Sequence, residues 1–409
     1  MKLSALQRGS SRVDGSGNRR GVLTAWTIWI MLASGVVVGC LFNIIWMSAV
    51  RNDARNCSAS AALAAGHSYL SDDILRSWQQ TFEYDGRVAR CQNAAISIVE
   101  FYRKQNSLPP ITAEHVQIQW PETEVAVKDP SNLVPTKISV GFDHDDKSSQ
   151  IPLFFSGLTG VSNAKLGVCS TVILEHAPAA FQPGPGNTVP MLPFAITDQA
   201  SVNPGSLKPV SSGHWTSNIE SGKGRDCFSW NNETRLFENG PDGLPEVTVT
   251  IYSGATTIAD DAFVPLSFCA ANAGQASGRI PEWIDRGLSE ADVKSLGMER
   301  VSFPSSLPTA LLALPQQSTT VAALQKKIGE PCIICLCTAN PADASTSFTV
   351  GTVSLKRPVA ARLVQVTTTV KGNVKVTLQP CVLVTSTAIT ANDTPIASNR
   401  YVYSVRLCN

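Results

Sequence analysis

The pattern of apolar and polar residues divides the chain into one uninterrupted apolar run and a long region of short alternating segments. The run covers residues 21–50 and contains no Asp, Glu, Lys, Arg or His. About 20 residues of helix, at ~1.5 Å per residue, cross the ~30 Å hydrocarbon layer of a bilayer. The run also exceeds the ~7–15-residue apolar core of a signal peptide. We therefore predict a retained transmembrane helix over residues 21–50, surrounded by membrane lipid.

The residues beside this run predict its orientation. Residues 1–20 carry five basic residues against Asp14, together with Ser and Gly, which is typical of a disordered basic tail. Basic residues gather on the cytoplasmic side of membrane helices. We therefore expect the N-terminus in the cytoplasm and the bulk of the chain on the other side. The residues that mark the ends of the anchor are Arg19, Arg20, Gly21, Val22 and Val50.

Helical spacing continues beyond the apolar run. Residues 48–70 lack Pro and are rich in Ala, the strongest helix former. Residues 86–106 show a second amphipathic pattern, and after them the period changes to two. Helices followed by strands predict an α+β domain over residues 51–176. The expected strands are residues 116–120, 125–127, 137–142, 151–155 and 167–176.

A stretch rich in Pro and Gly, residues 177–190, is typical of a linker. It predicts a second, mixed β-rich domain over residues 191–409. Two short helices are expected within residues 280–297, the second with Ser289 as its N-cap, and another at residues 319–328. The expected strands are residues 246–252, 332–337, 348–355, 361–370, 373–378 and 401–407.

Composition and charge narrow the range of functions. The 409 residues include 33 Lys and Arg against 32 Asp and Glu, a net charge of +1. This balance argues against nucleic-acid binding through bulk positive charge. The sequence contains no nucleotide-binding glycine loop, no G-x-S-x-G and no H-E-x-x-H, and its five histidines are scattered. We predict no catalytic residue and no cofactor.

Three clusters contain residue types that bind metals, and each has a plainer interpretation. Residues 143–146 (DHDD) offer oxygen ligands for Ca²⁺, but they lack the further acid and the Gly of an EF-hand loop, which favours a polar hairpin tip. For the cysteines of the C-x-x-C-x-C at residues 332–337 we favour the interpretation that they are core thiols, with a disulfide or a zinc site as alternatives. Residues 343–347 (DASTS) match a von Willebrand A metal-adhesion loop, yet they do not follow a strand directly. We predict no metal site.

Two pairs of residues are candidates for joining helices. Gly35 and Gly39 form a G-x-x-x-G, either a helix-packing face or ordinary glycine of a membrane helix. Cys57 and Cys91 lie on the faces of the two helices expected after the run, and an exterior location permits disulfides. We name Cys57–Cys91 as a candidate cross-link and leave the pairing of the other cysteines open.

Residues 19–21 (RRG), the apolar run and residues 49–66 (AVRNDARNCSASAALAAG) resemble the N-terminal module of TadE/TadG-like proteins of Tad (Flp) pilus assembly. The strand pattern of residues 137–176 is similar to the pilin-like continuation of that family. The second half resembles TadG-like chains of the planctomycete type. Its similar segments are residues 191–196 (MLPFAI), 240–249 (GPDGLPEVTV), 284–293 (IDRGLSEADV), 324–336 (LQKKIGEPCIICL) and 374–380 (VKVTLQP).

Two departures from the family refine what the resemblance implies. Prepilin cleavage in this system resembles a cut after Gly with Glu five residues further on, and Trp26 stands at that place counted from Gly21. A clear von Willebrand A domain, common in larger members, is also lacking. The resemblance therefore implies an anchored structural or accessory component of pilus or envelope assembly in the bacterial inner membrane, not a processed major pilin. Its partners would be other Tad or envelope proteins.

A second hypothesis belongs to a different functional class. The chain could be a membrane-tethered extracytoplasmic binding module that captures a ligand or a cell-wall polymer. Its basis is the β-rich region after the anchor, which carries no recognised catalytic motif.

Overall fold

A computed structural model describes the chain as two compact units. Met1–Ser58, Val99–Ile111 and Gly141–Cys169 belong to the first unit, and Ala59–Ile98, Thr112–Val140 and Ser170–Asn409 to the second. The expected strand at 125–127 and the clusters at 143–146 and 343–347 lie outside the described residues. The structure describes residues 17–76, 84–105, 108–120, 134–142, 150–198, 215–251, 262–270, 273–310, 314–338, 352–370, 372–390 and 399–408.

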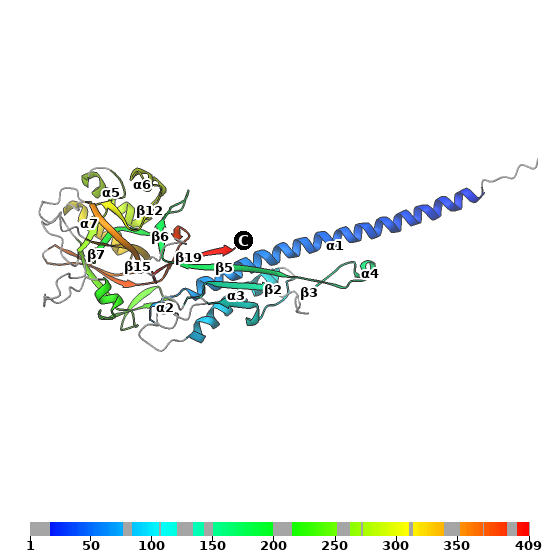
Figure 1. Ribbon diagram of the computed structural model, residues 1–409, viewed down its shortest axis with the longest axis horizontal. Coiled ribbons are helices and arrows are strands. Elements are labelled where there is room, and N and C mark those ends of the chain that lie inside the picture. The colour runs from blue at the N-terminus through cyan, green and yellow to red at the C-terminus, as the bar shows by residue number, and fades with distance from the viewer. Residues whose placement is uncertain are drawn as a thin grey trace, which may run out of the picture. The chain divides into compact units, whose positions relative to one another are not determined.

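The fold is α+β, with a long apolar helix at the N-terminus and a β-rich region after it (Figure 1). Helix α1 (Gly17–Tyr69) runs without a break, which confirms that helical structure continues past the apolar run. The absence of Pro and the many Ala residues explain this continuity. The other described helices are α2 (Asp73–Arg76), α3 (Tyr84–Gln105), η1 (Ala113–His115), α4 (Ser156–Thr159), η5 (Thr216–Glu220), α5 (Ala273–Arg286), α6 (Glu290–Ser295) and α7 (Leu314–Lys326).

A five-stranded sheet joins strands from both ends of the chain. Its order is β1-β2-β5-β19-β17, and β5 and β19 are antiparallel with Tyr403 opposite His176. Gly66 of α1 lies against this sheet, because a Cβ there would be 3.2 Å from Val405 and 3.4 Å from Val172. The strands are β1 (Val116–Gln119), β2 (Lys137–Phe142), β5 (Val168–His176), β17 (Leu383–Val384) and β19 (Val402–Cys408).

A second sheet closes on itself. Its order is β13-β15-β14-β7-β11-β10-β16, and β15 also pairs with β16, so six of the strands form a barrel. Its strands are rich in buried apolar side chains, among them Phe194 and Phe263, whose ring centroids are 4.5 Å apart in a stacked arrangement. The strands are β7 (Met191–Thr197), β10 (Val247–Ile251), β11 (Ala262–Pro265), β13 (Ser305–Pro308), β14 (Pro331–Thr338), β15 (Thr352–Thr368) and β16 (Val374–Pro380).

The long strand β15 corrects the expectation of separate strands at 348–355 and 361–370. Pro358 lies inside it, opposite Cys335 of β14. The first part of β15 pairs with β13 and the last part with β16. β15 therefore pairs with β14 on one side and with β13 and β16 on the other, and its pairing with β16 closes the barrel. The local sequence pattern does not reveal such long-range pairing.

The expected linker, residues 177–190, contains a strand. Within it β6 (Pro178–Phe181) lies between β12 (Val301–Ser302) and β18 (Ala388–Thr390). Phe181 is fully buried, so this Pro- and Gly-rich stretch is part of the core. Because β19 also pairs with β5, residues 51–176 and 191–409 both contribute strands to one sheet.

Two hairpins complete the described strands. β3 (Gln150–Pro152) pairs with β4 (Asn163–Lys165), and β8 (Phe228–Asn231) pairs with β9 (Leu236–Asn239). The strand expected at 151–155 ends at Pro152, because the chain then turns into α4.

A buried ion pair fixes the C-terminal end of α1 to the barrel. Asp72 follows α1 and accepts a hydrogen bond from the Arg362 guanidinium of β15. It also accepts one from the backbone N–H of Val382 at 2.7 Å. Both charged side chains are nearly buried, with exposed fractions of 12% and 11%, so their pairing is not screened by water.

Gly287 tests a different close contact, between the end of helix α5 and the backbone at Val189. Its φ is +79°, and a Cβ would lie 2.2 Å from the backbone oxygen of Val189. We expect Gly287→Ala to lower the free energy of unfolding by more than about 2 kcal/mol, measured by urea titration in detergent. The control is Gly297→Ala, which has a φ of +72° but open space around its Cβ. It should cost only about 1 kcal/mol, and equal losses would contradict the close approach.

Candidate functional site

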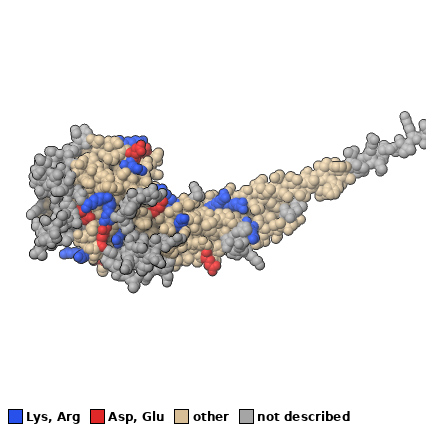
Figure 2. All heavy atoms as spheres, in the orientation of Figure 1, with Lys and Arg blue, Asp and Glu red and all other residues tan. Residues whose placement is uncertain are grey.

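The first candidate site is the exposed apolar part of α1. Large apolar side chains there face outward, with exposed fractions of 65% for Trp26, 71% for Trp29 and 75% for Met31. Figure 2 shows a long stretch of this helix without Lys, Arg, Asp or Glu. So much contiguous apolar surface is unfavourable in water and marks an interaction with lipid or protein. Within the described residues, α1 is the one helix long and apolar enough to span a membrane.

Regular burial of one face of α1 starts at the predicted end of the anchor, after the isolated buried residues Gly39 and Asn43. Val50 is 5% exposed, and small residues beyond it are fully buried. Arg19, Arg20, Gly21 and Val22 belong to the first turns of the same helix. The helix therefore changes from an outward-facing apolar surface to a packed small-residue surface close to the boundary expected at Val50. The fully buried small residues are Ala54, Cys57, Ala61, Ala62 and Ala65.

The β3–β4 hairpin contacts α1 inside the apolar run. The ring of Phe154 lies 5.5 Å from that of Phe42 and 4.9 Å from that of Trp46, both edge-on. The ring of Phe155 lies 5.7 Å from that of Phe42, and its backbone N–H donates to Asn43 Oδ1 at 3.3 Å. Edge-on aromatic pairs contribute beyond their buried area. The hairpin tip and residues 42–46 of α1 therefore form one aromatic cluster.

Gly35 and Gly39 differ in their surroundings. A Cβ on Gly35 would meet no atom within 4 Å, whereas Gly39 is buried. The face that carries Gly35 is thus open within this chain. Its use for packing a second helix stays a prediction.

Cys57 and Cys91 are both buried free thiols, so the structure does not contain the candidate cross-link. Burial raises the pKa of Cys57 to about 11 and that of Cys91 to about 12. The thiolate is the form that forms disulfides. At neutral pH both side chains are therefore held in the unreactive thiol form.

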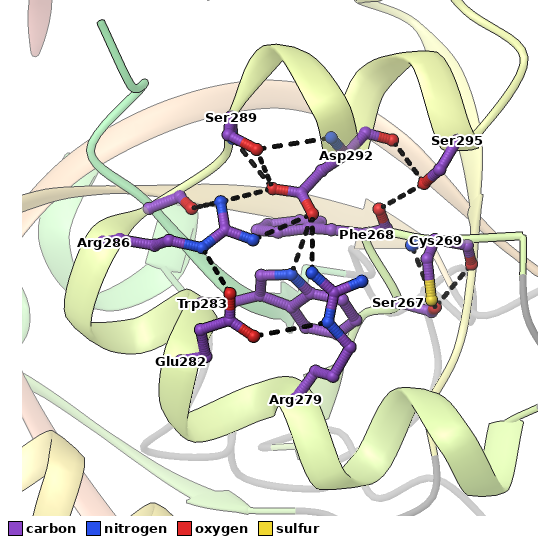
Figure 3. Close-up of polar contacts among 11 residues, drawn as sticks. Ser267, Phe268, Cys269, Arg279, Glu282, Trp283, Arg286, Ser289, Asp292 and Ser295 are labelled. Atoms are coloured by element: carbon purple, nitrogen blue, oxygen red, sulfur yellow. Dashed lines mark hydrogen bonds and ion pairs between the residues drawn. The ribbon is translucent and has the colours of Figure 1, made fainter. Parts of the chain in front are cut away.

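The second candidate site is a cluster of charged side chains around Asp292 at the α5–α6 junction (Figure 3). Arg286 donates to both carboxylate oxygens, at 2.6 and 3.0 Å. The Trp283 indole donates at 3.1 Å. Ser289 donates through its backbone N–H at 3.0 Å and its hydroxyl at 2.6 Å. Ser289 is thus the N-cap that the sequence predicted, within a capping box completed by Asp292.

The geometry around Asp292 suits a structural role. Burial on its own would raise the pKa of this carboxyl, but the hydrogen bonds from Arg286 and Ser289 outweigh burial and hold its pKa below the usual range. Its side chain is 1% exposed and both oxygens already accept several donors. A general acid or base needs a raised pKa and access to substrate. Asp292 therefore locks α5 to α6 and has no oxygen left for a substrate.

A cavity of about 240 Å³ lies beside this cluster. Arg286, Lys327 and Glu330 are among the residues that line it. Lys327 Nζ is 2.7 Å from Glu330 Oε2, and Arg286 is held by Asp292. Because both cations are already paired, the cavity does not favour a charged ligand.

The cysteines of β14 lie in the core. Cys332, Cys335 and Cys337 are buried free thiols, and burial raises the pKa of each. Among the residues that the structure describes, no group of three or more His, Cys, Asp or Glu could hold a metal ion. These thiols therefore act as apolar core residues.

Comparison with family models, with curated proteins and with solved structures gave no match. The family resemblance therefore depends on the similar sequence segments alone. Sequence reasoning missed the aromatic cluster and the Asp292 cluster. The sequence signal for the aromatic cluster was Asn43, a polar residue within the apolar run. The signal for the Asp292 cluster was the three-residue spacing of Ser289 and Asp292.

Asp292→Asn tests the structural role. We expect a loss of about 3–5 kcal/mol in the free energy of unfolding at pH 7, because Arg286 is left without its counter-charge. The native pKa of Asp292 is lowered, so its contribution is present above ~4 and is lost as the pH falls further. The difference between wild type and variant, followed by tryptophan fluorescence in urea, should therefore shrink below pH ~4.

Glu282→Gln is the matched control for Asp292→Asn. Glu282 accepts from the same Arg286 at 2.9 Å, but half of its side chain is exposed. Its loss should cost less than about 1 kcal/mol. A similar loss in both variants, or a pH-independent difference for Asp292→Asn, would contradict the assigned role.

Proposed function

We propose that the protein is a membrane-anchored structural or accessory component of Tad/Flp-type pilus or envelope assembly. The observation that carries this proposal is helix α1, whose exposed apolar segment continues directly into a buried small-residue stripe. One continuous helix thus carries both the exposed apolar surface and the stripe that packs in the folded body.

The contact between α1 and its sheet supports a pilin-like body. Gly66 lets the helix approach the antiparallel strands β5 and β19. Ala61, Ala62 and Ala65 are fully buried on the same part of α1. Small residues allow close helix–sheet packing, and a helix laid on antiparallel strands is the arrangement that the family resemblance implies.

Trp26 supports an anchored component and not a cleaved subunit. It stands where the resemblance places a glutamate in processed pilins, and 65% of its surface is exposed. An indole favours the interface of a bilayer with water. In this proposal the N-terminal residues remain in the cytoplasm of a bacterium, α1 crosses the inner membrane once, and the body folds in the periplasm.

The orientation is tested with reporter fusions. We expect alkaline phosphatase fused after Asn409 to be active and the same enzyme fused before Lys2 to be inactive, because five basic residues precede the apolar run. Activity is measured in intact cells. Removal of residues 21–50 from the Asn409 fusion is the control and should abolish its activity. The reverse pattern would overturn the orientation.

The role in assembly is tested by complementation. If genes for a secretion ATPase and a Tad-type membrane platform neighbour this gene, its deletion should reduce surface pili counted by electron microscopy. The combined change Val37→Arg and Val38→Arg should fail to restore them, because each Arg at a helix centre costs about 2.5–3.5 kcal/mol of insertion.

Val370→Arg is the matched control for that complementation. Val370 is fully exposed, so an Arg there meets only solvent and should restore pili fully. Normal pili in the deletion strain, or neighbouring genes of another kind, would contradict the proposed function.

A further inference from the structure

We propose that the tip of the β3–β4 hairpin, residues 153–161, is a second membrane-contacting element that lies in the bilayer interface beside α1. The surface is interfacial, and its partner is the phospholipid bilayer. The inference deepens the proposed function and depends on α1 crossing the membrane.

The contacts within the first unit place the tip beside the apolar run. Phe154 and Phe155 both contact Phe42, and Phe154 also contacts Trp46. These contacts leave much of the tip uncovered, with exposed fractions of 61% for Phe154 and 51% for Val161. Figure 1 draws α4, the turn at the tip, alongside α1. The same apolar surface that α1 presents therefore continues onto the hairpin.

Helix geometry sets the depth of these contacts. Val22 and Phe42 are about 20 residues apart, which at ~1.5 Å per residue equals the ~30 Å of hydrocarbon. If the hydrocarbon begins at Val22, it ends at Phe42, where the hairpin tip is attached. Residues 42–50 then cross the layer of headgroups. With this placement of the 30-residue apolar run, which is longer than the hydrocarbon layer, the tip lies at the boundary between acyl chains and headgroups.

The distribution of charge agrees with this depth. Residues 150–164 contain no Asp, Glu, Lys or Arg, and Lys165 is the first charged residue after the tip. On α1 the first charges are Arg51 and Asp53, about 12 Å beyond Asn43 at ~1.5 Å per residue. Uncharged residues thus lie at the tip and charged residues of both signs at its base, which agrees with a tip that enters an apolar layer and a base that stays in water.

Asn43 gives an independent reason for the same depth. Its Oδ1 accepts the Phe155 N–H, but its Nδ2 is buried without a protein hydrogen-bond partner. The Trp46 Nε1 is likewise buried and unpartnered. Such groups are strongly disfavoured in the hydrocarbon centre and tolerated at the wetter interface. The hairpin tip that covers Asn43 therefore belongs to the interface as well.

Lipid photocrosslinking of the full-length chain tests the proposal. The photoreactive residue p-benzoylphenylalanine replaces Phe154, Met31 or Phe101 in separate variants, which are reconstituted into phosphatidylethanolamine–phosphatidylglycerol vesicles. After irradiation, mass spectrometry measures the fraction of protein with a phospholipid adduct. Phe101 is the matched control, because it is also a phenylalanine and its exposed fraction is 58% against 61% for Phe154. Met31 reports on α1 itself.

We expect adducts at positions 31 and 154, with at least a fivefold lower yield at position 101. Adducts at 31 but none at 154, or equal yields at 154 and 101, would overturn the hairpin proposal and leave the anchor intact. No adduct at 31 would overturn membrane anchoring, and the hairpin proposal with it. A second measurement covers misfolding: each variant must keep the wild-type pattern of limited proteolysis, and a variant that loses it is replaced by the same label at Phe155.

Discussion

The apolar surface of α1 is the constraint on which the rest of the molecule depends. Side chains such as Trp29 and Met31 are more than two-thirds exposed, and water cannot solvate a helix of this composition without a large free-energy penalty. The helix must therefore lie in lipid or against another protein. The same helix continues without a break to Tyr69, so the apolar segment and the buried small-residue stripe belong to one secondary-structure element.

The folded body depends on contacts between residues far apart in the chain. β19, at the C-terminal end, pairs with β5 beneath Gly66, and Arg362 of the barrel holds Asp72 just after α1. The C-terminal end of α1 is thus held by residues from the last part of the sequence. A truncated chain without β19 would lose the strand that lies against Gly66, so the second unit needs its C-terminal strand to complete this sheet.

Periodicity predicted the helices and strands that depend on local sequence. It failed for the elements whose structure is determined by contacts with residues far away in the chain. The apolar run, the Ala-rich helix and the alternating strands β2 and β5 were found from spacing alone, as was the N-cap Ser289. Strand β6 was missed because Pro and Gly are typical of linkers, and only its neighbours β12 and β18 make it a strand. The aromatic cluster around Phe154 was missed for the same reason, since its partners lie on α1.

The buried polar side chains of Asp292 and Asn43 obtain their hydrogen-bond partners in different ways. Asp292 finds its donors within the α5–α6 junction, so it is stable wherever that junction folds. Asn43 receives one long-range donor, from a hairpin that leaves Phe154 mostly exposed. In water such a tip gains little from staying on α1, whereas in the interface both faces of the aromatic cluster leave water. In the proposed arrangement the bilayer is therefore the partner that makes this contact favourable, and the hairpin tip and the helix lie in it together.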